Sequence, residues 1–303
     1  MKNYKPKAYL MINKTNLHAG SGESGFGIVD NMVQRDTVSN IPVVFSSSLK
    51  GAIRDHFKDY LGKKNLEIDG ERICGTCFES IFGAEGTNEH SNENKEDTKP
   101  TSKKVHHQGL VKFLDAKLLF LPLRSNKIPY VHVTSKEYIE DFVRFLKEIG
   151  IKLGVNLQEV KKNTFYSKQK LKNILVEDVE FEKSEIPNEE ILKIMKLFEI
   201  ENLAVMTNED FNYYISNLPV IARNKLNNGK SENLWYEEVV PREGRFVSIL
   251  MYYDNFDESD KNKFEKAFRK FEEKLLSDNI QIGANESIGY GICKFKKIGE
   301  ENE

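Results

Sequence analysis

The segment from His18 to Arg35 reads HAGSGESGFGIVDNMVQR and surrounds a run of glycines with one histidine and one aspartate, Asp30. Because glycine has no Cβ, the run Gly20, Gly22 and Gly25 lets another molecule approach the main chain closely. A histidine and an aspartate are groups that transfer protons, and a carboxylate is also a ligand for Mg²⁺ or another divalent cation. The segment is therefore either a slack loop or a binding loop with chemistry beside it.

The same glycines satisfy the G-x-G-x-x-G pattern of dinucleotide-binding folds. Such a fold needs a helix directly after the glycines, so that the pyrophosphate lies on the helix N-terminus. The stretch that follows, FGIVDNMVQRD, has no helical apolar face. We reject the dinucleotide interpretation, and a small-molecule enzyme that binds a nucleotide here is the least favoured function.

A basic stretch, SSSLKGAIRDHFK, runs from Ser46 to Lys58. Its serines, Ser47 and Ser48 among them, provide capping hydroxyls, and a helix N-terminus suits a phosphate group. Lys50, Arg54 and Lys58 are spaced four residues apart and would share one helix face. Periodicity alone favours an ordinary solvated face over a phosphate-binding one.

A third stretch, LPVIARNKLNNGKSENLWYEEVVP (218–241), combines a basic, Asn/Gly-rich centre with aromatic and acidic residues. Hairpins of this composition suit single-stranded nucleic acid, whose bases stack on aromatic rings. The alternative is a surface β-ribbon whose tryptophan packs on the core. The residues of interest are Arg223, Trp235, Tyr236, Glu237 and Glu238.

Cys74 and Cys77, in the sequence C-G-T-C, form half of a zinc site that His56, His106 and His107 would complete. No second C-x-x-C exists, so we interpret the pair as two free thiols. Three cysteines in a long chain argue against a disulfide framework and for a reducing cytoplasm. His132 lies on an apolar strand, where a hydrogen-bonded core histidine is more common than a metal ligand.

The composition is that of a soluble globular protein: 303 residues, 39% hydrophobic and 30% charged. The formal net charge of −2 excludes global basicity, so a nucleic acid would have to bind a local patch. No apolar run reaches the roughly 18 residues of a membrane helix, and the N-terminus has no secretory signal. We therefore expect a cytoplasmic protein without a membrane partner.

Hydrophobic patterning predicts a mixed α+β chain. Residues 84–104 contain almost no apolar side chain and predict an exposed, disordered loop. A helix follows a capping box formed by Thr134 and Glu137. The order of two β-α-β halves suggests a ferredoxin-like core with large excursions. Strands are expected over 4–15, 109–123, 245–253 and the final segment, and helices are expected with apolar faces at Leu49, Ile53 and Phe57, at Phe142, Leu146 and Ile149, at Ile191, Ile194, Met195 and Phe198, and at Phe264, Phe268, Phe271 and Leu275.

Four stretches taken in order resemble the RAMP superfamily, and within it the backbone subunits, counted fourth, of type III-B CRISPR (Cmr) effector complexes. They are HAGSGESGFGIVDNMVQRD, IPVVFSSSLKGAIR, LPVIARNKL with NLWYEEVVP, and GANESIGYG. The resemblance extends from His18 to Gly291, and the pairing of GIVD with SSLKGAIR is its most specific part. Residues 62–105 and 150–205 resemble no family.

The resemblance implies one domain over 1–303, with a ferredoxin-like (RRM-like) palm and a protruding thumb hairpin in 205–244. Residues 62–106 would be a lid-like insertion and 150–204 a second insertion. Copies of such subunits stack along a guide crRNA, and each thumb interrupts the guide–target duplex. The implied partners are the guide, single-stranded target RNA, further copies of the chain in a filament and other Cmr subunits.

The resemblance also implies residue roles. Asp30 matches the aspartate needed for cleavage, and His18, Glu237 or Glu238 would assist it. Mg²⁺ or another divalent cation at Asp30 is the implied cofactor, and zinc at the cysteine pair is a further candidate. The implied RNA contacts are Gly20, Gly22, Gly25, Ser47, Ser48, Lys50, Arg54, Arg223, Trp235, Tyr236, Gly283, Asn285, Gly289 and Gly291.

The implied activity is endonucleolytic cutting of target RNA at regular intervals. RNA carries its own nucleophile, the 2′-hydroxyl, so the protein has only to align it and stabilise the developing charge. A flipped nucleotide no longer has the helical geometry that protects the chain. A non-catalytic guide-binding scaffold is the alternative, and Asp30 in the glycine loop favours the nuclease.

Overall fold

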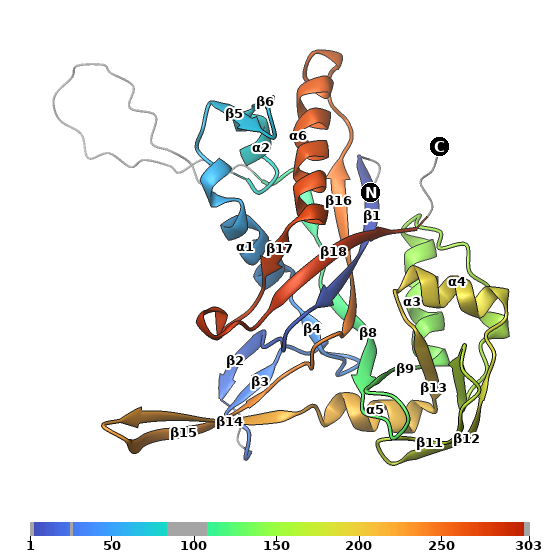
Figure 1. Cartoon of the computed structure of the whole chain (residues 1–303). Helices are drawn as coiled ribbons and strands as arrows, with labels where there is room; N and C mark the ends of the chain where they lie inside the picture. Colours follow the sequence, from blue (N-terminus) through green and yellow to red (C-terminus); the bar gives the residue numbers. More distant parts are fainter. Residues whose placement is uncertain (1–2, 25–26, 84–107, 300–303) are drawn as a thin grey trace, which may run out of the picture. The chain divides into compact units, whose positions relative to one another are not determined.

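The computed structural model describes residues 3–24, 27–83 and 108–299 of the chain, which is mixed α+β as the sequence predicts (Figure 1). Gly25, His106, His107 and the expected loop at 84–104 lie outside the described residues. The chain divides into two compact units. The first comprises Met1–Lys5, Arg54–Lys112 and Met251–Lys274, and the second comprises Pro6–Ile53, Phe113–Leu250 and Leu275–Glu303.

A large sheet runs through the second unit in the order β11-β12-β10-β13-β9-β8-β16-β1-β18-β17. Its central strand β1 is continuously buried from Ala8 to Asn13, as expected of a strand covered on both faces. β18 instead alternates buried and exposed positions. The strands are β1 (Tyr4–Asn13), β8 (Ala116–Leu123), β9 (Val131–Ser135), β10 (Thr164–Ser167), β11 (Lys172–Val176), β12 (Val179–Glu185), β13 (Asn202–Met206), β16 (Arg245–Tyr253), β17 (Asn279–Gln281) and β18 (Ile292–Ile298), with β4 (Val43–Val44) on β8 and β7 (Val111–Phe113) on β16.

Helix α1 (Ser46–His56) forms as predicted, with Leu49 and Ile53 buried on one face. The expected basic stripe of three residues is wrong, because the helix ends before Lys58. That residue begins a short 3₁₀ turn, η1 (Lys58–Tyr60), and its ammonium pairs with Asp55 at 3.6 Å. Only Lys50 and Arg54 remain one turn apart on the helix.

Helix α3 (Lys136–Glu148) also forms as predicted, but its cap was placed one residue too early. The hydroxyl of Ser135, not that of Thr134, accepts a hydrogen bond from the Tyr138 amide. Glu137 pairs with Lys162 instead of completing a capping box. Helices α4 (Glu189–Leu197) and α5 (Asn208–Ser216) have their own caps, Asn188 and Thr207.

The first unit has an aromatic core in which the rings of Phe57, Phe78, Phe82 and Phe271 contact one another. It comprises β5 (Asn65–Ile68), β6 (Glu71–Cys74), α2 (Gly75–Glu79) and most of α6 (Glu258–Ser277). The predicted free thiols at the start of α2 are a disulfide between Cys74 and Cys77. The turn brings their Cα atoms to 5.2 Å, within the disulfide range, whereas Cys293 is free and buried.

A second sheet in the order β14-β15-β3-β2 contains a long hairpin that projects from the body of the second unit (Figure 1). It consists of β14 (Val220–Asn227) and β15 (Lys230–Glu238). Asn228 and Gly229 both have positive φ, 49° and 79°, as a two-residue type I′ turn requires. Beside its base lie β3 (Asn31–Val33) and β2 (Gly20–Ser24).

The hairpin begins later than the sequence suggested. Met206, Phe211 and Tyr214 lie within the expected thumb range 205–244 but are buried, Met206 on β13 and the other two on α5. Phe211 and Tyr214 are buried because, with Ile215, they recur at helical spacing on the inner face of α5. Tyr213 is exposed. No helix among the described residues is long and apolar enough to cross a membrane.

Candidate active site at the base of the hairpin

Asp30 lies at the turn between the glycine strand β2 and β3 and is exposed. Its main-chain amide donates to the carbonyl of Tyr236 at 3.1 Å, and its Oδ2 accepts from the Tyr236 amide at 2.7 Å. Both bonds hold the aspartate against the edge of β15. Oδ1 has no hydrogen-bond partner among the described residues, so one carboxylate oxygen remains available to a ligand.

Glu238, two residues further along β15, is buried and fully hydrogen-bonded. Its Oε2 accepts from the Val33 amide at 3.0 Å, and its Oε1 binds the guanidinium of Arg35. The Nδ1 of His18 lies 2.7 Å from the Glu238 carbonyl and donates to it, because a carbonyl oxygen can only accept. Glu238 thus fixes both β3 and His18.

Glu237 faces the other side of β15 and is equally occupied. Its carboxylate accepts hydrogen bonds from Arg223, from the indole Nε1 of Trp235 and from the amide of Asn285, each at 2.9 Å. Burial raises the pKa of Glu237, but these hydrogen bonds and the charge of Arg223 outweigh it, so the pKa lies below its ordinary value. Arg223 also stacks over the ring of Tyr290, 4.6 Å from its centre.

The C-terminal glycine-rich loop (283–291) packs through its main chain against the residues around Asp30, which we call the Asp30 corner. The Ala284 amide donates to the His18 carbonyl at 2.8 Å. A Cβ on Gly283 would lie 2.4 Å from that carbonyl oxygen, and one on Gly291 would lie 1.9 Å from the Ile282 oxygen. Both glycines have positive φ, and Asn285 adopts the left-handed conformation (φ 65°). Close packing therefore explains the two glycines without reference to a ligand.

The structure thus brings together seven of the predicted site residues: Asp30, His18, Glu237, Glu238, Arg223, Trp235 and Asn285. Tyr236 joins them through its main chain. Ser47, Lys50 and Arg54 lie apart, on α1, and nothing lies within 4 Å of a Cβ placed on Gly22 or Gly289. Of the predicted acid–base residues, only Asp30 is exposed.

Asp30 fits a divalent cation that also binds substrate oxygens. It does not fit a metal ion held by protein side chains alone. Among the described residues, no group of three or more His, Cys, Asp or Glu side chains is arranged to hold a metal ion. Asp30 offers one carboxylate oxygen, and Mg²⁺ commonly binds through one carboxylate, waters and substrate phosphate oxygens. The cysteine pair does not fit zinc, because its sulfurs are bonded to each other.

Two residues of this corner were missed by the sequence analysis. Arg35 pairs with Glu238 and donates to the carbonyl of Ile215 at 2.7 Å. Gln34 is buried, and its side-chain amide is hydrogen-bonded to Gly20 of β2 and to Phe45 and Ser48 at the start of α1. No spacing rule identifies them; the only indication is two long polar side chains directly after a short strand.

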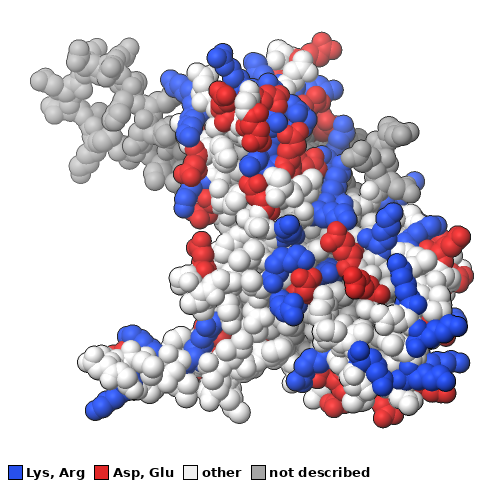
Figure 2. Space-filling view, in the orientation of Figure 1, with Lys and Arg blue, Asp and Glu red and all other residues white. Residues whose placement is uncertain are grey.

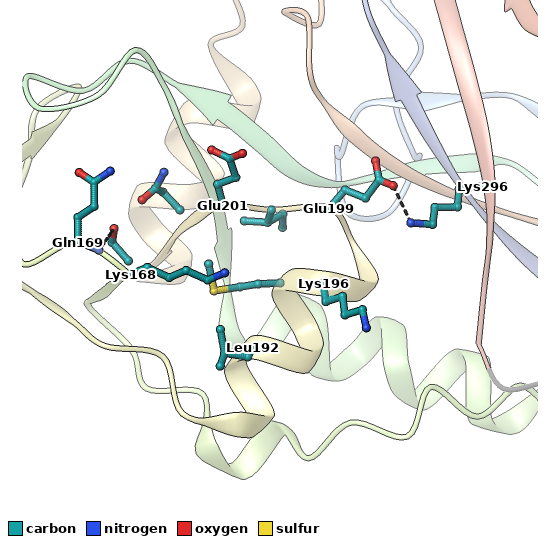
Figure 3. A pocket seen from close by; sticks show the side chains of 11 residues that line it. Lys168, Gln169, Leu192, Lys196, Glu199, Glu201 and Lys296 are labelled. Atoms are coloured by element: carbon teal, nitrogen blue, oxygen red, sulfur yellow. Dashed lines mark hydrogen bonds and ion pairs between the residues drawn. The ribbon is translucent and has the colours of Figure 1, made fainter.

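A cavity of about 850 Å³ lies elsewhere in the second unit, next to α4 (Figure 3). Leu192 and Met195 of α4 and Lys168 and Gln169 of the β10–β11 loop line it, and an ion pair between Glu199 and Lys296 (2.6 Å) closes one end. It shares no residue with the Asp30 corner. In Figure 2 the hairpin has a few basic side chains among uncharged residues, whereas the lobe that contains α4 has interspersed basic and acidic side chains.

The RAMP superfamily matches residues 13–294. The chain belongs to the RAMP superfamily. Among curated RAMP relatives, the CRISPR system Cmr endoribonuclease Cmr4 of Pyrococcus furiosus is 28% identical over 95% of each chain. The CRISPR system CMR subunit Cmr4 of Saccharolobus solfataricus is 25% identical over 97% of each chain.

Solved structures share the fold of this RAMP chain. A type III-B Cmr-beta complex bound to cognate target RNA contains a chain with a TM-score of 0.68 and 21% identity, covering 97% of this chain and 98% of that one. Oligomeric Cmr4 from Pyrococcus furiosus has a TM-score of 0.64 and 23% identity, covering 96% and 98%. These likenesses concern the fold alone.

Proposed function

We propose that this chain is a guide-RNA-binding backbone subunit of a type III-B CRISPR effector complex and that it cuts target RNA. The observation that carries the proposal is the exposed Asp30 carboxylate, which two hydrogen bonds hold at the base of a protruding hairpin. Full-length similarity to a relative named as a CRISPR Cmr endoribonuclease supports the same activity. The partners are the guide crRNA, single-stranded target RNA, further copies of the chain and other Cmr subunits, in the cytoplasm.

Strands β1, β8, β16 and β18 form the palm in this proposal. Two observations support a ferredoxin-like palm. The strands lie in the order β8-β16-β1-β18 in the sheet, and along the chain α1 follows β1 and precedes β8, whereas α6 follows β16 and precedes β18. The hairpin β14–β15 is the thumb within 205–244. Residues 62–106 and 150–204 are insertions in a single RAMP domain, and β10–β13 of the second insertion extend the palm sheet.

The chemistry proposed at the Asp30 corner requires only one protein group to act on the RNA. The 2′-hydroxyl of the nucleotide before the cut attacks the adjacent phosphorus, and the 5′-oxygen leaves. Asp30 lies at the reacting phosphodiester, where its carboxylate accepts the proton of the attacking 2′-hydroxyl, and the leaving 5′-oxygen takes a proton from water. Asp30 is also the residue that would hold a divalent cation. Such a cation would supply charge stabilisation for the phosphorane. His18, Glu237 and Glu238 are buried and partnered, so they position the corner and do not transfer the proton.

The RNA path is the second part of the proposal. Lys50 and Arg54 on α1 bind guide phosphates, with Ser47 and Ser48 at the helix N-terminus. The hairpin separates adjacent base pairs, because its outer residues Leu226 and Leu234 are exposed and apolar. The main chain of the glycine strand faces the displaced target nucleotide. Arg223, Trp235 and Asn285 hold the thumb base, so their contacts to RNA are through their outer edges only.

Two substitutions at Asp30 test the proposal in the reconstituted complex. Asp30→Asn keeps an oxygen for the Tyr236 amide and removes the charge, and Asp30→Ala removes both. Both should slow cutting by about 10²- to 10⁴-fold while guide and target binding stay near wild type. Asp141→Asn, an exposed aspartate of α3 paired with Arg144, is the matched control.

Cutting at the wild-type rate by Asp30→Asn would show that the charge is not used. Wild-type cutting by both variants would leave the chain as a non-catalytic scaffold on the guide.

A further inference from the structure

The side chain of Gln34 connects two elements that carry different parts of the proposed function. Its Nε2 donates to the carbonyl of Gly20 at 3.0 Å and to the hydroxyl of Ser48 at 2.9 Å. Its Oε1 accepts from the amide of Phe45 at 2.7 Å. Gly20 begins the glycine strand β2, whereas Phe45 and Ser48 lie at the N-terminus of α1. One buried amide therefore joins the glycine strand to the basic helix.

The main chain of Gln34 makes further connections. Its amide donates to the Ala19 carbonyl at 2.8 Å, and its carbonyl accepts from the Val43 amide at 2.9 Å. Gln34 directly follows β3, and Asp30 directly precedes it. The three-residue strand is thus bonded to Tyr236 at one end and to α1 at the other. A displacement at the Gln34 end is carried to Asp30 by a strand too short to absorb it.

Only a primary amide of this length satisfies the three partners at once. It donates two hydrogens and accepts with its oxygen in one plane. An ionised glutamate at this position would accept from Phe45 but present a negative oxygen to the Gly20 carbonyl. A methionine would fill the volume and leave the Gly20 oxygen and the Phe45 amide without partners, at a cost comparable to a lost buried hydrogen bond.

We infer that Gln34 is a positioning residue that couples the guide-binding end of α1 to the placement of the Asp30 carboxylate. The inference rests on the proposed function and adds to it a physical connection between guide binding and cutting. When α1 is fixed by a guide, the Ser48 and Phe45 bonds fix Gln34. Gln34 in turn fixes Gly20 above the His18 ring, where a Cβ would lie 3.1 Å from Nε2.

The test compares Gln34→Met and Gln34→Glu with wild type in the guide-loaded complex. The readouts are the single-turnover cutting rate at saturating labelled target RNA and, separately, the target dissociation constant. Gln34→Met should cut roughly ten- to a hundred-fold more slowly, the effect of an ångström-scale misplacement, with target affinity within about two-fold of wild type. Gln158→Met, in the exposed turn η2 (Leu157–Glu159), is the matched control and should match wild type.

A pH series adds a readout that lost stability does not produce. In the Gln34→Glu variant, protonation of the new carboxylate restores one donor, so the ratio of the variant rate to the wild-type rate should rise as the pH falls. The Gln34→Met ratio should stay level. The charged and titratable groups beside the position or beside its hydrogen-bond partners are His18, Arg35, Asp36, Asp115, Lys117 and Glu238, and division by the wild-type rate at each pH removes their contribution.

Full-rate cutting by Gln34→Met would overturn the inference. So would a parallel fall in cutting, target affinity and thermal unfolding midpoint, which would indicate a purely structural amide. If Gln34→Met does not fold, a Gln34→Glu ratio independent of pH overturns the inference in its place. The Asp30 variants separate this result from the proposed function: wild-type cutting by Asp30→Asn and Asp30→Ala refutes the catalytic assignment, whatever Gln34 does.

Discussion

The two ends of the hairpin β14–β15 are built in opposite ways. At its base, Glu237 and Glu238 are 5% and 4% exposed, and their carboxylates hold Arg223, Trp235, Asn285, Arg35 and the Val33 amide. At its tip, Leu226 and Leu234 are 61% and 53% exposed, and the ion pair of Lys225 with Glu232 lies in solvent. The base is held by buried hydrogen bonds and ion pairs, and the tip is exposed to solvent.

The difference teaches that polar residues on one strand have unequal roles. Carboxylates near a proposed cleavage site are usually assigned a catalytic role. Those of Glu237 and Glu238 are instead hydrogen-bonded to neighbouring residues. The exposed Asp30 comes from the turn before β3 and is bonded to the same β15 main chain. A buried ion pair fixes geometry at the expense of desolvation, whereas an exposed one contributes little.

The largest effect is expected from breaking the base. Glu238→Ala leaves the buried Arg35 guanidinium and the Val33 amide without their partner, so it should lower the free energy of unfolding by about 3–5 kcal/mol. Glu232→Ala at the tip breaks an exposed pair and should cost about 0–1 kcal/mol. Trp235, the only tryptophan, reports on the base, so its emission in a urea titration is the measurement. Equal losses in the two variants would contradict the comparison.

Shortening the tip should separate cutting from folding. Removing the Leu226–Asn227 and Lys230–Ser231 segments while keeping the Asn228–Gly229 turn should leave the unfolding curve and guide binding near wild type. Leu226, one of the two exposed apolar residues proposed to replace a lost stack, would then be absent, a contribution of about 1–3 kcal/mol per base. We expect target affinity to fall moderately and cutting to fail or lose its regular spacing. The product ladder of labelled target RNA measures this, and an unaltered ladder would place the wedge elsewhere.

The basic helix should show a smaller effect that depends on salt. Lys50→Ala with Arg54→Ala removes two proposed phosphate contacts, and each should reduce the slope of log K against log salt by roughly 0.7. Lys58→Ala, beyond the end of α1 and paired with Asp55, is the control and should leave the slope unchanged. The measurement is a salt titration of guide binding. Equal slopes for wild type, the double variant and Lys58→Ala would show that this helix face is an ordinary solvated surface.

Acid should destabilise the core before the hairpin base. Burial, with the nearby Arg245 charge, lowers the pKa of His132 from 6.5 to about 3, so the neutral ring is favoured in the folded state. Its contribution to stability is complete above pH 6.5 and is lost as the pH falls toward 3. The pKa of Glu237 is also lowered, so its contribution is lost only below its ordinary value of 4.5.

Urea unfolding across this pH range measures the order of the two losses. His132→Gln should flatten the dependence of the free energy of unfolding on pH between pH 6.5 and 4.5. The loss of stability below pH 4.5 should remain. A slope in the upper range that survives this substitution would assign the early loss to another group.

Much of the fold followed from local pattern. The helices at α1, α3 and α4 and their buried faces are encoded by apolar residues at helical spacing, which is a local property. The rejection of a dinucleotide site was also sound, because the glycines lead into β2 and β3. His132 is a hydrogen-bonded core histidine, as predicted, with its Nε2 bonded to the Glu243 carbonyl at 2.9 Å.

The sequence predictions that the structure contradicts failed for one physical reason, because packing between distant parts of the chain decided the outcome. The cap of α3 moved from Thr134 to Ser135 because β9 continues through Ser135 in register with Met206. Three residues in the expected thumb range are buried, Phe211 and Tyr214 on the inner face of α5 and Met206 at the end of β13 in the large sheet. The cysteine pair is a disulfide because the start of α2 brings the two residues together, which the count of three cysteines did not reveal.

The sequence by itself determined the RAMP family, a glycine-rich segment that contains one aspartate, and a hairpin with an Asn/Gly-rich centre. These are properties of residue type and short spacing. The sequence predicted a loop where the structure has the strand β2. Only the tertiary structure decided that Glu237 and Glu238 are supports, that His18 is bonded to β15, and that Gln34 joins α1 to the active corner. Apart from the Trp235–Glu237 bond, these contacts join partners between 11 and 220 residues apart in the chain, and burial of the shared hydrogen bonds sets their roles.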